Sequence, residues 1–221
     1  MEKGRVKEMD QNVEFILERR VERTMEALVK NRMEAYYAPS AGKAKEAVIS
    51  LLREGAVVSH GGSQTLIECG IIDELRSGKY NYLDRSAPGL SKEQVTEIYR
   101  RSFFADYYLG SANAITEEGE LFNVDGNGNR VAAYIYGPQN VILVAGINKI
   151  VPDIESALTR LRKMAAPANV KRLECETPCF RTGECMNCHT PGRICCDYVV
   201  QGFQRVPGRI KVVLVGEPLG Y

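Results

Sequence analysis

The sequence lacks any long hydrophobic run. Its strongest apolar stretch, residues 141–147, is far shorter than the roughly 20 residues that a membrane-spanning helix needs. The N-terminal region is interrupted by charged residues and has no unbroken apolar core, so it does not have the pattern of a secretory signal peptide. These absences favour a cytoplasmic protein without a membrane partner, in a compartment where thiols stay reduced.

The sequence also lacks an excess of charge of either sign. Lys and Arg number 29 and Asp and Glu number 28, which gives a formal net charge of +1. A chain-wide basic field of the kind that binds nucleic acid is therefore absent. Internal repeats and low-complexity segments are missing too. The 221 residues, of which 44% are hydrophobic, are typical of one globular domain with or without an insertion.

Cysteine, by contrast, is concentrated in one place. Cys69 stands alone, whereas the other six of the seven cysteines lie between residues 175 and 196. Clustering in a reducing compartment favours a metal site over a disulfide framework. Within a cysteine-rich segment at about residues 171–200, the spacing favours four ligands: Cys179, Cys185, Cys188 and Cys195.

Four thiolates suit either an iron–sulfur cluster or a tetrahedral zinc ion. Zinc sites usually have two Cys-x-x-Cys pairs, and only one is present here. The uneven outer spacing favours a 4Fe–4S cluster over zinc, although standard ferredoxin spacings are not matched. Alternative ligands remain, namely Cys196 or Cys175 in place of a named cysteine, and His189 in a zinc site.

Helical and strand patterns alternate along the chain. Apolar spacing predicts helices over residues 11–32, 40–53, 91–103, 131–136 and 152–165, and a short one through Leu66 and Ile67. Compact apolar runs predict strands at 33–38, 56–59, 120–124, 141–145 and 209–215, and one interrupted strand over 107–116. Residues 78–90 are predicted as a connection. This order implies an α/β fold with a mostly parallel sheet flanked by helices.

Two glycine-rich turns are candidate ligand-binding loops. The first joins a strand to a helix and contains Gly61, Gly62, Ser63 and Thr65. Backbone N–H groups and the positive end of the helix meet at such a turn, and they attract anions. The second, residues 125–130, ends in Arg130, whose guanidinium suits a carboxylate or phosphate. A tight connection without a ligand is the simpler explanation of either turn, because a lone glycine-rich loop is weak evidence of binding.

Other polar residues near these turns complete the set of candidates. The asparagines that we expect to orient the same anion are Asn113, Asn127 and Asn129. Glu68 and Glu117 are the candidate catalytic carboxylates, because a carboxylate can form covalent intermediates. Most glutamates, however, are solvated surface residues. His60 is either a general base or a structural residue, and Lys149 is either an anion contact or a charge near a helix.

Three segments together resemble the LUD domain, the lactate-utilisation domain of bacterial and archaeal proteins. They are GGSQTL at residues 61–66, DYYLGSANAIT at 106–116 and DGNGNRVAA at 125–133. The terminal VGEPLGY at 215–221 fits the same family. The resemblance spans nearly the whole chain, and its motifs occur in the expected order.

The resemblance implies a single α/β domain over residues 1–221, similar in fold to ribose-5-phosphate isomerase and CoA transferases, with the cysteine-rich segment as an insertion. It implies a part in oxidation of lactate to pyruvate, alongside iron–sulfur or flavin redox partner subunits. CoA transferases use a glutamate nucleophile, which is the reason for considering Glu68 and Glu117. The cysteine segment marks a subset of the family. Apart from the resemblance, the apolar stripe of the N-terminal helix is either part of the intramolecular core, which is the commoner case, or a homodimer face.

Three hypotheses follow for function. The first is a redox protein of the LUD type that binds a 2-hydroxy or 2-oxo acid, or a similar small anion, and carries an iron–sulfur cluster. The second is an isomerase- or transferase-like enzyme that acts on a phosphorylated or acyl substrate and holds a structural zinc. The third is a regulatory or assembly subunit without chemistry of its own.

Overall fold

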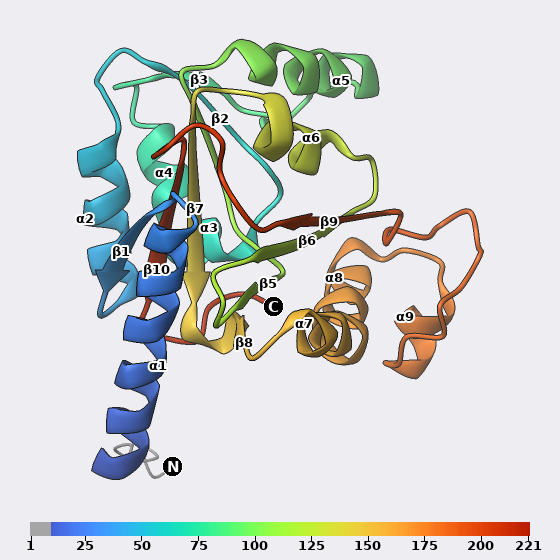
Figure 1. Cartoon of the computed structure of the whole chain (residues 1–221). Helices are drawn as coiled ribbons and strands as arrows, with labels where there is room; N and C mark the ends of the chain where they lie inside the picture. The colour runs from blue at the N-terminus through green and yellow to red at the C-terminus, as the bar shows by residue number, and fades with distance from the viewer. Residues whose placement is uncertain (1–9) are drawn as a thin grey trace, which may run out of the picture.

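The centre of the computed structural model, which describes residues 10–221, is a six-stranded sheet. In spatial order its strands are β1 (Glu34–Ala38), β10 (Ile210–Val215), β7 (Asn140–Gly146), β4 (Tyr107–Gly110), β2 (Val57–His60) and β3 (Asn81–Leu83). Every neighbouring pair in this sheet is parallel. The predicted α/β fold with a mostly parallel sheet flanked by helices is therefore confirmed (Figure 1).

The central strands are apolar on both faces. In β7, Val141 and Leu143 belong to one buried cluster, and Ile142 and Val144 belong to another. Because side chains alternate along a strand, these two pairs point to opposite faces of the sheet. A parallel sheet needs such continuous apolar strands because both of its faces are covered. Burying each of these side chains contributes about 1.5–3 kcal/mol.

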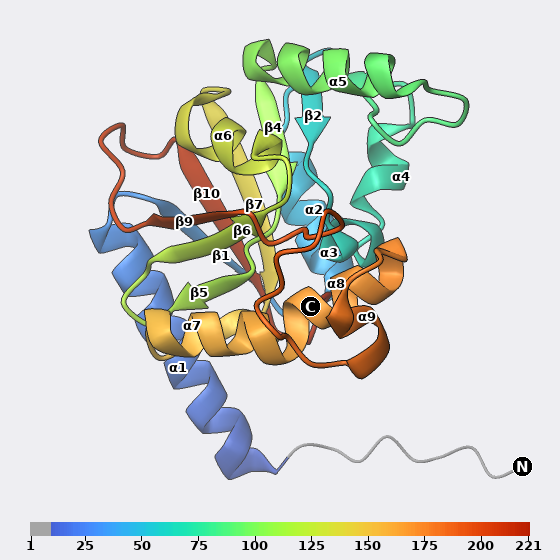
Figure 2. The ribbon, with the colours of Figure 1, turned by 90° about the vertical axis from the view of Figure 1, so that its right-hand side faces the viewer.

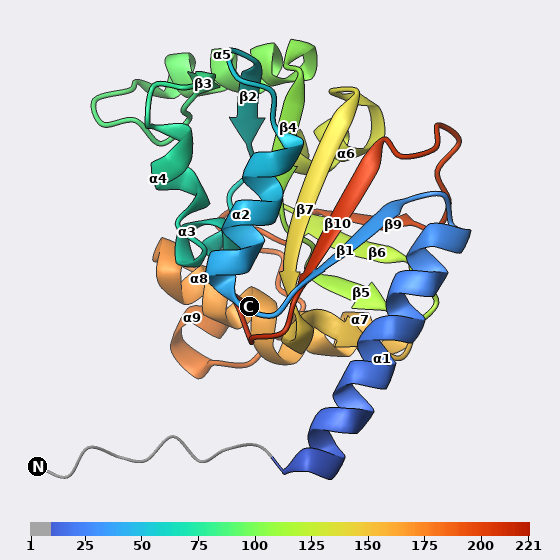
Figure 3. The ribbon, with the colours of Figure 1, turned by 90° about the vertical axis from the view of Figure 1, so that its left-hand side faces the viewer.

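Helices cover the two faces unequally. On one face lie α2 (Ala41–Leu51), α3 (Gln64–Glu68) and α4 (Ile71–Leu75), and Figure 3 shows α2 in front of the sheet. On the other face lie α1 (Gln11–Lys30) and α6 (Asn129–Tyr136). Serines cap two of the helices: Ser40 caps α2, and Ser91 forms a capping box with Gln94 at α5 (Lys92–Arg101).

A second, four-stranded sheet lies across the same face as α6 (Figure 2). Its order is β8 (Ile150–Val151), β5 (Ala114–Thr116), β6 (Leu121–Asp125) and β9 (Asp197–Gln201). The prediction of one interrupted strand over 107–116 is therefore wrong, because β4 and β5 belong to different sheets. At Ser111 the backbone N–H donates to the Tyr134 hydroxyl at 3.1 Å, so the chain leaves the first sheet there.

The connection predicted over residues 78–90 contains β3, a short strand at the edge of the large sheet. The helix predicted over 152–165 also continues further than expected. It consists of α7 (Ile154–Arg160), a π-helical turn (Leu161–Ala165) and α8 (Ala166–Leu173). The wide turn ends two residues before Pro167, which has no N–H to donate to the helix.

The cysteine-rich segment follows α8. It contains α9 (Pro178–Thr182) and leads into β9, so the chain leaves the helical layer and returns as an edge strand of the second sheet. Short 3₁₀ turns at Ser102–Phe104 and Ile147–Lys149 complete the fold. Within residues 10–221, no helix combines the length and the apolar composition needed to cross a membrane.

Candidate functional site

The carboxyl ends of four parallel strands supply the floor of a cleft. The turn after β2 brings Gly62 and Ser63, the turn after β4 brings Ser111, and the turn after β7 brings Lys149. The chain after β10 adds Tyr221. In open parallel sheets, ligands bind outside the carboxyl ends of the strands, because the loops of neighbouring strands meet there.

The walls of the cleft come from other elements. The turn after β6 contributes Asn127 and Asn129, α8 contributes Asn169 and Arg172, and the cysteine-rich segment contributes Arg193. The cleft has a volume of about 260 Å³, which suits a small molecule, because drug-sized ligands occupy roughly 300–1,000 Å³.

Positive charge dominates the lining of the cleft. Among residues 10–221, its basic side chains are Arg85, Arg130, Lys149, Arg172 and Arg193, and its one acidic side chain is Asp125. Asp125 is moreover occupied, because one of its oxygens accepts hydrogen bonds from the backbone N–H groups of Arg130 (2.9 Å) and Val131 (3.1 Å) at the start of α6. The cleft therefore holds a surplus of cations and attracts anions.

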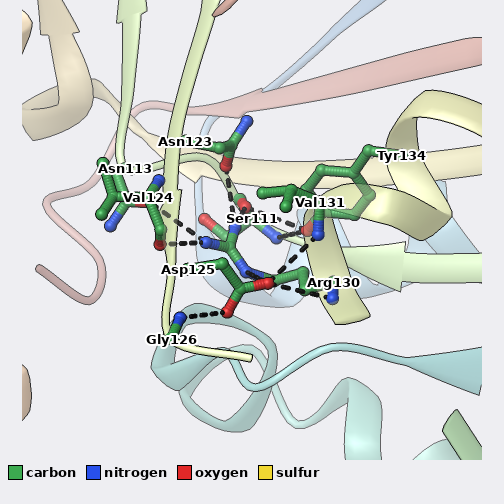
Figure 4. A network of polar contacts seen from close by, with 9 residues as sticks. All are labelled: Ser111, Asn113, Asn123, Val124, Asp125, Gly126, Arg130, Val131 and Tyr134. Atoms are coloured by element: carbon green, nitrogen blue, oxygen red, sulfur yellow. Dashed lines mark hydrogen bonds and ion pairs between the residues drawn. The ribbon is translucent and has the colours of Figure 1, made fainter. Parts of the chain in front are cut away.

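Arg130 was predicted to bind the ligand, and the structure directs its guanidinium to protein acceptors (Figure 4). Nη1 donates to the Asn123 side chain at 2.7 Å and to the Ser111 carbonyl at 3.0 Å. Nη2 donates to the Val124 carbonyl at 2.7 Å and to the Asn113 side chain at 3.1 Å. Arg130 thereby ties β6 to the segment that joins β4 and β5.

The charge of Arg130 is also supported electrostatically. Burial acts to lower the pKa of the guanidinium, but nearby Tyr134 and Asp125 outweigh it, and the net shift is upward. The Asp125 carboxylate lies 3.9 Å from Nε, and the Tyr134 ring lies 5.5 Å from the guanidinium carbon. Arg130 is thus a buried cation with a full set of partners.

The first glycine turn is shaped by the same arginine. A Cβ on Gly61 would lie 2.7 Å from two methylene carbons of Arg130, so only glycine leaves room for that side chain. At Gly62, a Cβ would meet the guanidinium of Arg85 at 3.3 Å. These two glycines therefore allow the side chains of Arg130 and Arg85 to lie close to the backbone of the turn.

The hydroxyls of the first turn have local roles as well. The Ser63 hydroxyl accepts from the backbone N–H of Leu66 at 3.2 Å and caps α3. The Thr65 hydroxyl is buried and accepts from Lys149 Nζ at 3.0 Å. Ser63 borders the cleft directly, whereas Thr65 acts on it through the lysine.

Lys149 is the second buried cation of the floor, and its exposed fraction is 3%. Nζ donates to Thr65 Oγ1 at 3.0 Å and to Ser111 Oγ at 2.9 Å. Burial, followed by the nearby charges of Arg160 and Arg130, lowers the pKa of Lys149 to about 7. No carboxylate within residues 10–221 forms an ion pair with this amine.

The predicted catalytic carboxylates lie outside the lining of the cleft. Glu68 accepts a hydrogen bond from the backbone N–H of Gly220 at 2.7 Å. Glu117 pairs with Arg20 at 2.7 Å and with Arg23 at 3.4 Å on helix α1. Both carboxylates thus hold other parts of the chain in place.

His60 does not line the cleft either. It is buried, and its Nδ1 is 2.9 Å from the Tyr82 hydroxyl. Burial, with a smaller effect of Arg85, lowers the pKa of His60 to about 4. The imidazole is therefore neutral at physiological pH and links β2 to β3.

The four predicted metal ligands line one small cavity in the cysteine-rich segment. These residues are Cys179, Cys185, Cys188 and Cys195, and the cavity has a volume of about 20 Å³. Cys175 and Cys196 do not line it, and Cys196 is exposed. All seven cysteines are free thiols.

The neighbouring cysteines affect the pKa of Cys195. Burial, with a contribution from Cys185 and smaller ones from Cys179 and Cys188, raises the pKa of Cys195 to about 11. Among residues 10–221, no three His, Cys, Asp or Glu side chains are close enough together to form a metal-binding group. Binding a metal at this cavity therefore needs the sulfur atoms to move closer together.

The turn between Cys185 and Cys188 has hydrogen bonds of the kind that metal-bound thiolates accept. Asn187 adopts a φ of 47°, a left-handed conformation that asparagine tolerates better than most residues. In this turn the Asn187 N–H donates to Cys185 Sγ at 3.5 Å, and the Thr190 hydroxyl donates to Cys188 Sγ at 3.7 Å. Hydrogen bonds to sulfur tune thiolate ligands.

The cysteine cavity and the cleft share a wall, because Arg193 and Ile194 line both. The Arg193 guanidinium donates to the carbonyls of Cys188 and Cys195, the latter at 2.7 Å. A Cβ on Gly126, in the second glycine turn, would lie 3.3 Å from the Ile194 carbonyl. The cysteine-rich segment therefore packs closely against the cleft, although the two are far apart in sequence.

Comparison with protein-family models shows the family of this chain. A model of the LUD domain matches residues 21–215. The chain belongs to the LUD domain family. Comparison with curated proteins gives no match.

Among solved structures, this LUD domain is similar to a DUF162 family protein from Deinococcus radiodurans. The identity is 16%, the TM-score is 0.52, and the match covers 90% of this chain and 98% of that one. At this identity the likeness shows a common fold alone.

Two translation initiation factors give weaker and partial matches. They are eIF2B beta from Chaetomium thermophilum, at 15% identity and a TM-score of 0.35, and eIF-2B from Pyrococcus horikoshii, at 19% and 0.32. The first match covers 52% of this chain and 40% of that one, and the second covers 63% and 51%. These TM-scores are too low to establish a common fold.

Sequence reasoning found most of the turns but missed several lining residues. The missed residues are Arg85, Ser111, Arg172 and Arg193, and Lys149 was noted without a decision between two roles. The position of Arg193 among the cysteines could have marked it as a candidate site residue. Arg85 lies in a segment predicted as a plain connection, and no pattern marked it.

Proposed function

We propose that this LUD domain binds a small organic anion, such as a 2-hydroxy or 2-oxo acid, and passes electrons through an adjoining cysteine-bound iron–sulfur cluster. The observation that carries the proposal is the surplus of positive charge in the cleft. Four of the five basic lining side chains, those of Arg85, Lys149, Arg172 and Arg193, have no ion pair with a carboxylate within residues 10–221. A bound carboxylate supplies the missing charge, and arginines bind it through paired hydrogen bonds.

The size and position of the cleft support a small acid. A volume of about 260 Å³ is enough for a few carbon atoms with polar groups. The buried polar floor at Ser111 and Lys149 offers hydrogen bonds to a hydroxyl or keto oxygen. A site built to hydrogen-bond such an oxygen discriminates strongly against analogues that lack it.

The donor chemistry of the cysteine cavity fits an iron–sulfur cluster. The ligands we propose are Cys179, Cys185, Cys188 and Cys195, since soft thiolates are the usual ligands of such clusters. When bound, the cluster would supply one-electron transfer. Oxidation of a 2-hydroxy acid to a 2-oxo acid releases two electrons, so we also propose an iron–sulfur or flavin partner subunit as the acceptor.

A single zinc ion is the alternative, and the size of the cavity favours it. About 20 Å³ is close to the space of one water molecule, so a cluster requires a larger rearrangement of the segment than one ion does. With zinc the cysteine site would be structural, and the cleft would belong to an isomerase- or transferase-like enzyme.

Anaerobic purification followed by metal analysis and visible absorption tests the cysteine proposal. We expect a brown protein with iron and sulfide, and loss of the metal in Cys195→Ser but not in the matched variant Cys196→Ser. One zinc per chain in a colourless protein contradicts electron transfer. Equal metal content in both variants contradicts the ligand set.

Thermal unfolding with candidate acids tests the anion proposal. We expect lactate and pyruvate to raise the melting temperature of the parent chain, and Arg172→Gln to reduce that shift. Arg162→Gln is the matched control, since Arg162 is exposed on the preceding π-helical turn and does not line the cleft. Equal shifts in both variants contradict the assignment of the cleft.

A further inference from the structure

Lys149 is placed unusually for a lysine. Its amine lies at the floor of the cleft, and among residues 10–221 it is held by the hydroxyls of Thr65 and Ser111 alone, at 3.0 and 2.9 Å. The side chain is almost entirely buried, and its neighbouring charges include the cations Arg130 and Arg160. A buried ammonium without a carboxylate partner is costly in free energy, so a purely structural role explains this residue poorly.

The surroundings instead favour an uncharged amine. Burial lowers the pKa of Lys149 to about 7, with Arg160 and Arg130 adding to the effect, while Glu68 and Cys69 oppose it. A substantial fraction of the amine is then unprotonated at neutral pH. A free amine is a nucleophile, and lysines desolvated in this way form imines with carbonyl compounds.

We propose that Lys149 condenses with the carbonyl group of a 2-oxo acid whose carboxylate is bound by the arginines of the cleft. This inference rests on the proposed function, because it needs the acid to bind there. It adds a covalent step, and it restricts the reactive ligands to those that carry a ketone or aldehyde next to the carboxylate.

The step balances without any further reactant. The Nζ lone pair attacks the carbonyl carbon, a C–N bond forms, and the carbonyl oxygen takes up a proton. The carbinolamine then loses its hydroxyl group with a proton, as water, and a C=N bond remains. One amine and one 2-oxo acid give one imine and one water, and no electrons are gained or lost.

The two hydroxyls that hold Nζ are suited to move the protons of this step. Ser111 Oγ lies 3.5 Å from Thr65 Oγ1, so amine and hydroxyls form a closed triangle at the floor. Hydroxyl groups both donate and accept hydrogen bonds. They can take a proton from the attacking amine and return it to the leaving oxygen.

Two exposed lysines show the contrast with Lys149. Lys43 pairs with Glu46 at 2.7 Å, and Lys79 pairs with Glu74 at 2.7 Å, both at exposed positions. Their carboxylate partners favour the charged ammonium, which is not nucleophilic. Among the lysines of residues 10–221, Lys149 is the one that lines the cleft.

Reductive trapping tests the proposal on the full chain. The protein is incubated with pyruvate and cyanoborohydride near neutral pH, digested, and mapped by mass spectrometry. We expect one reduced adduct, on the peptide that contains Lys149, and none when lactate replaces pyruvate, because lactate has no carbonyl group. Lys149→Arg keeps a positive charge and should lose the adduct, whereas Lys43→Arg should keep it.

The outcomes separate the two proposals. Pyruvate binding without an adduct at Lys149 contradicts the covalent step and leaves the anion site standing. Absence of both binding and adduct contradicts the covalent step and the proposed function together. Adducts spread over the exposed lysines, without preference for Lys149, also overturn the inference. Thermal unfolding of Lys149→Arg shows whether the variant is folded.

Discussion

Arg130 and Lys149 are two buried cations on the floor of one cleft, and they differ in their partners. Arg130 donates to four oxygen atoms, two in β6 and two in the segment between β4 and β5, and has Asp125 beside it, so its charge is compensated by the protein. Lys149 has two hydroxyl partners and, within residues 10–221, no carboxylate partner. The pKa of Arg130 is shifted upward, and that of Lys149 is lowered to about 7.

From this difference we infer which buried charge serves the fold and which serves the proposed ligand. A fully partnered charge is costly to remove, because its partners are left unpaired in the interior. An under-partnered charge destabilises the free protein, and chains keep such groups chiefly at functional sites. We therefore assign Arg130 to the architecture of the cleft and Lys149 to its chemistry.

Replacing Arg130 should have the largest effect. Arg130→Met removes four hydrogen bonds, to the side-chain oxygens of Asn113 and Asn123 and to the carbonyls of Ser111 and Val124. Asn113 and Ser111 keep the Val124 N–H and the Tyr134 hydroxyl as donors, whereas the buried Asn123 oxygen loses the Arg130 donor. We expect a loss of about 3–5 kcal/mol in the free energy of unfolding, measured by urea denaturation. Arg162→Met is the exposed control. A loss below about 1 kcal/mol would mean that Arg130, like Lys149 in this account, does not contribute to the stability of the fold.

Replacing Lys149 should change stability in the opposite direction. Lys149→Met removes the buried ammonium, and we expect the ligand-free variant to gain on the order of 1–4 kcal/mol at about pH 6. Between the folded pKa of about 7 and the higher unfolded one, the unfolded chain binds more protons, so the parent gains stability as pH rises. The gain of the variant should therefore shrink in alkaline solution. Denaturation at several pH values measures it.

The charge of Lys149 should have a smaller effect on the affinity of the cleft for anions. Lactate does not form an imine, so its binding reports the charge of Lys149 alone. As pH rises through about 7, the ammonium is lost, and we expect the Kd for lactate to rise by up to about tenfold per pH unit. Lys149→Arg should bind lactate without this dependence. Titration calorimetry measures both, and a flat profile for the parent contradicts the lowered pKa.

The large sheet could be predicted because short stretches of sequence indicate its strands and the helices next to them. In β7 and β10, short continuous apolar runs are enough to indicate buried strands, and the Ser40 and Ser91 caps mark helix starts within a few residues. The second sheet could not be predicted in this way. Its edge strand β9 exposes Tyr198 and Val200 to solvent, so it lacks the pattern of a buried strand.

The candidate site was predictable only where its residues are neighbours in sequence. Four cysteines within 17 residues of chain, 179–195, were expected to share a site, and they do line one cavity. Lys149 meets Thr65 across 84 positions and Ser111 across 38. No local pattern reports such contacts. For the same reason the sequence suggested a ligand role for Arg130 and not the protein acceptors that surround it.

The most direct test compares the unfolding free energies of ligand-free Arg130→Met and Lys149→Met with that of the parent at about pH 6. Opposite signs are predicted, with the arginine variant less stable and the lysine variant more stable than the parent. If both substitutions destabilise the chain to a similar degree, Lys149 is as much a part of the fold as Arg130, and the distinction between a structural and a functional cation is contradicted.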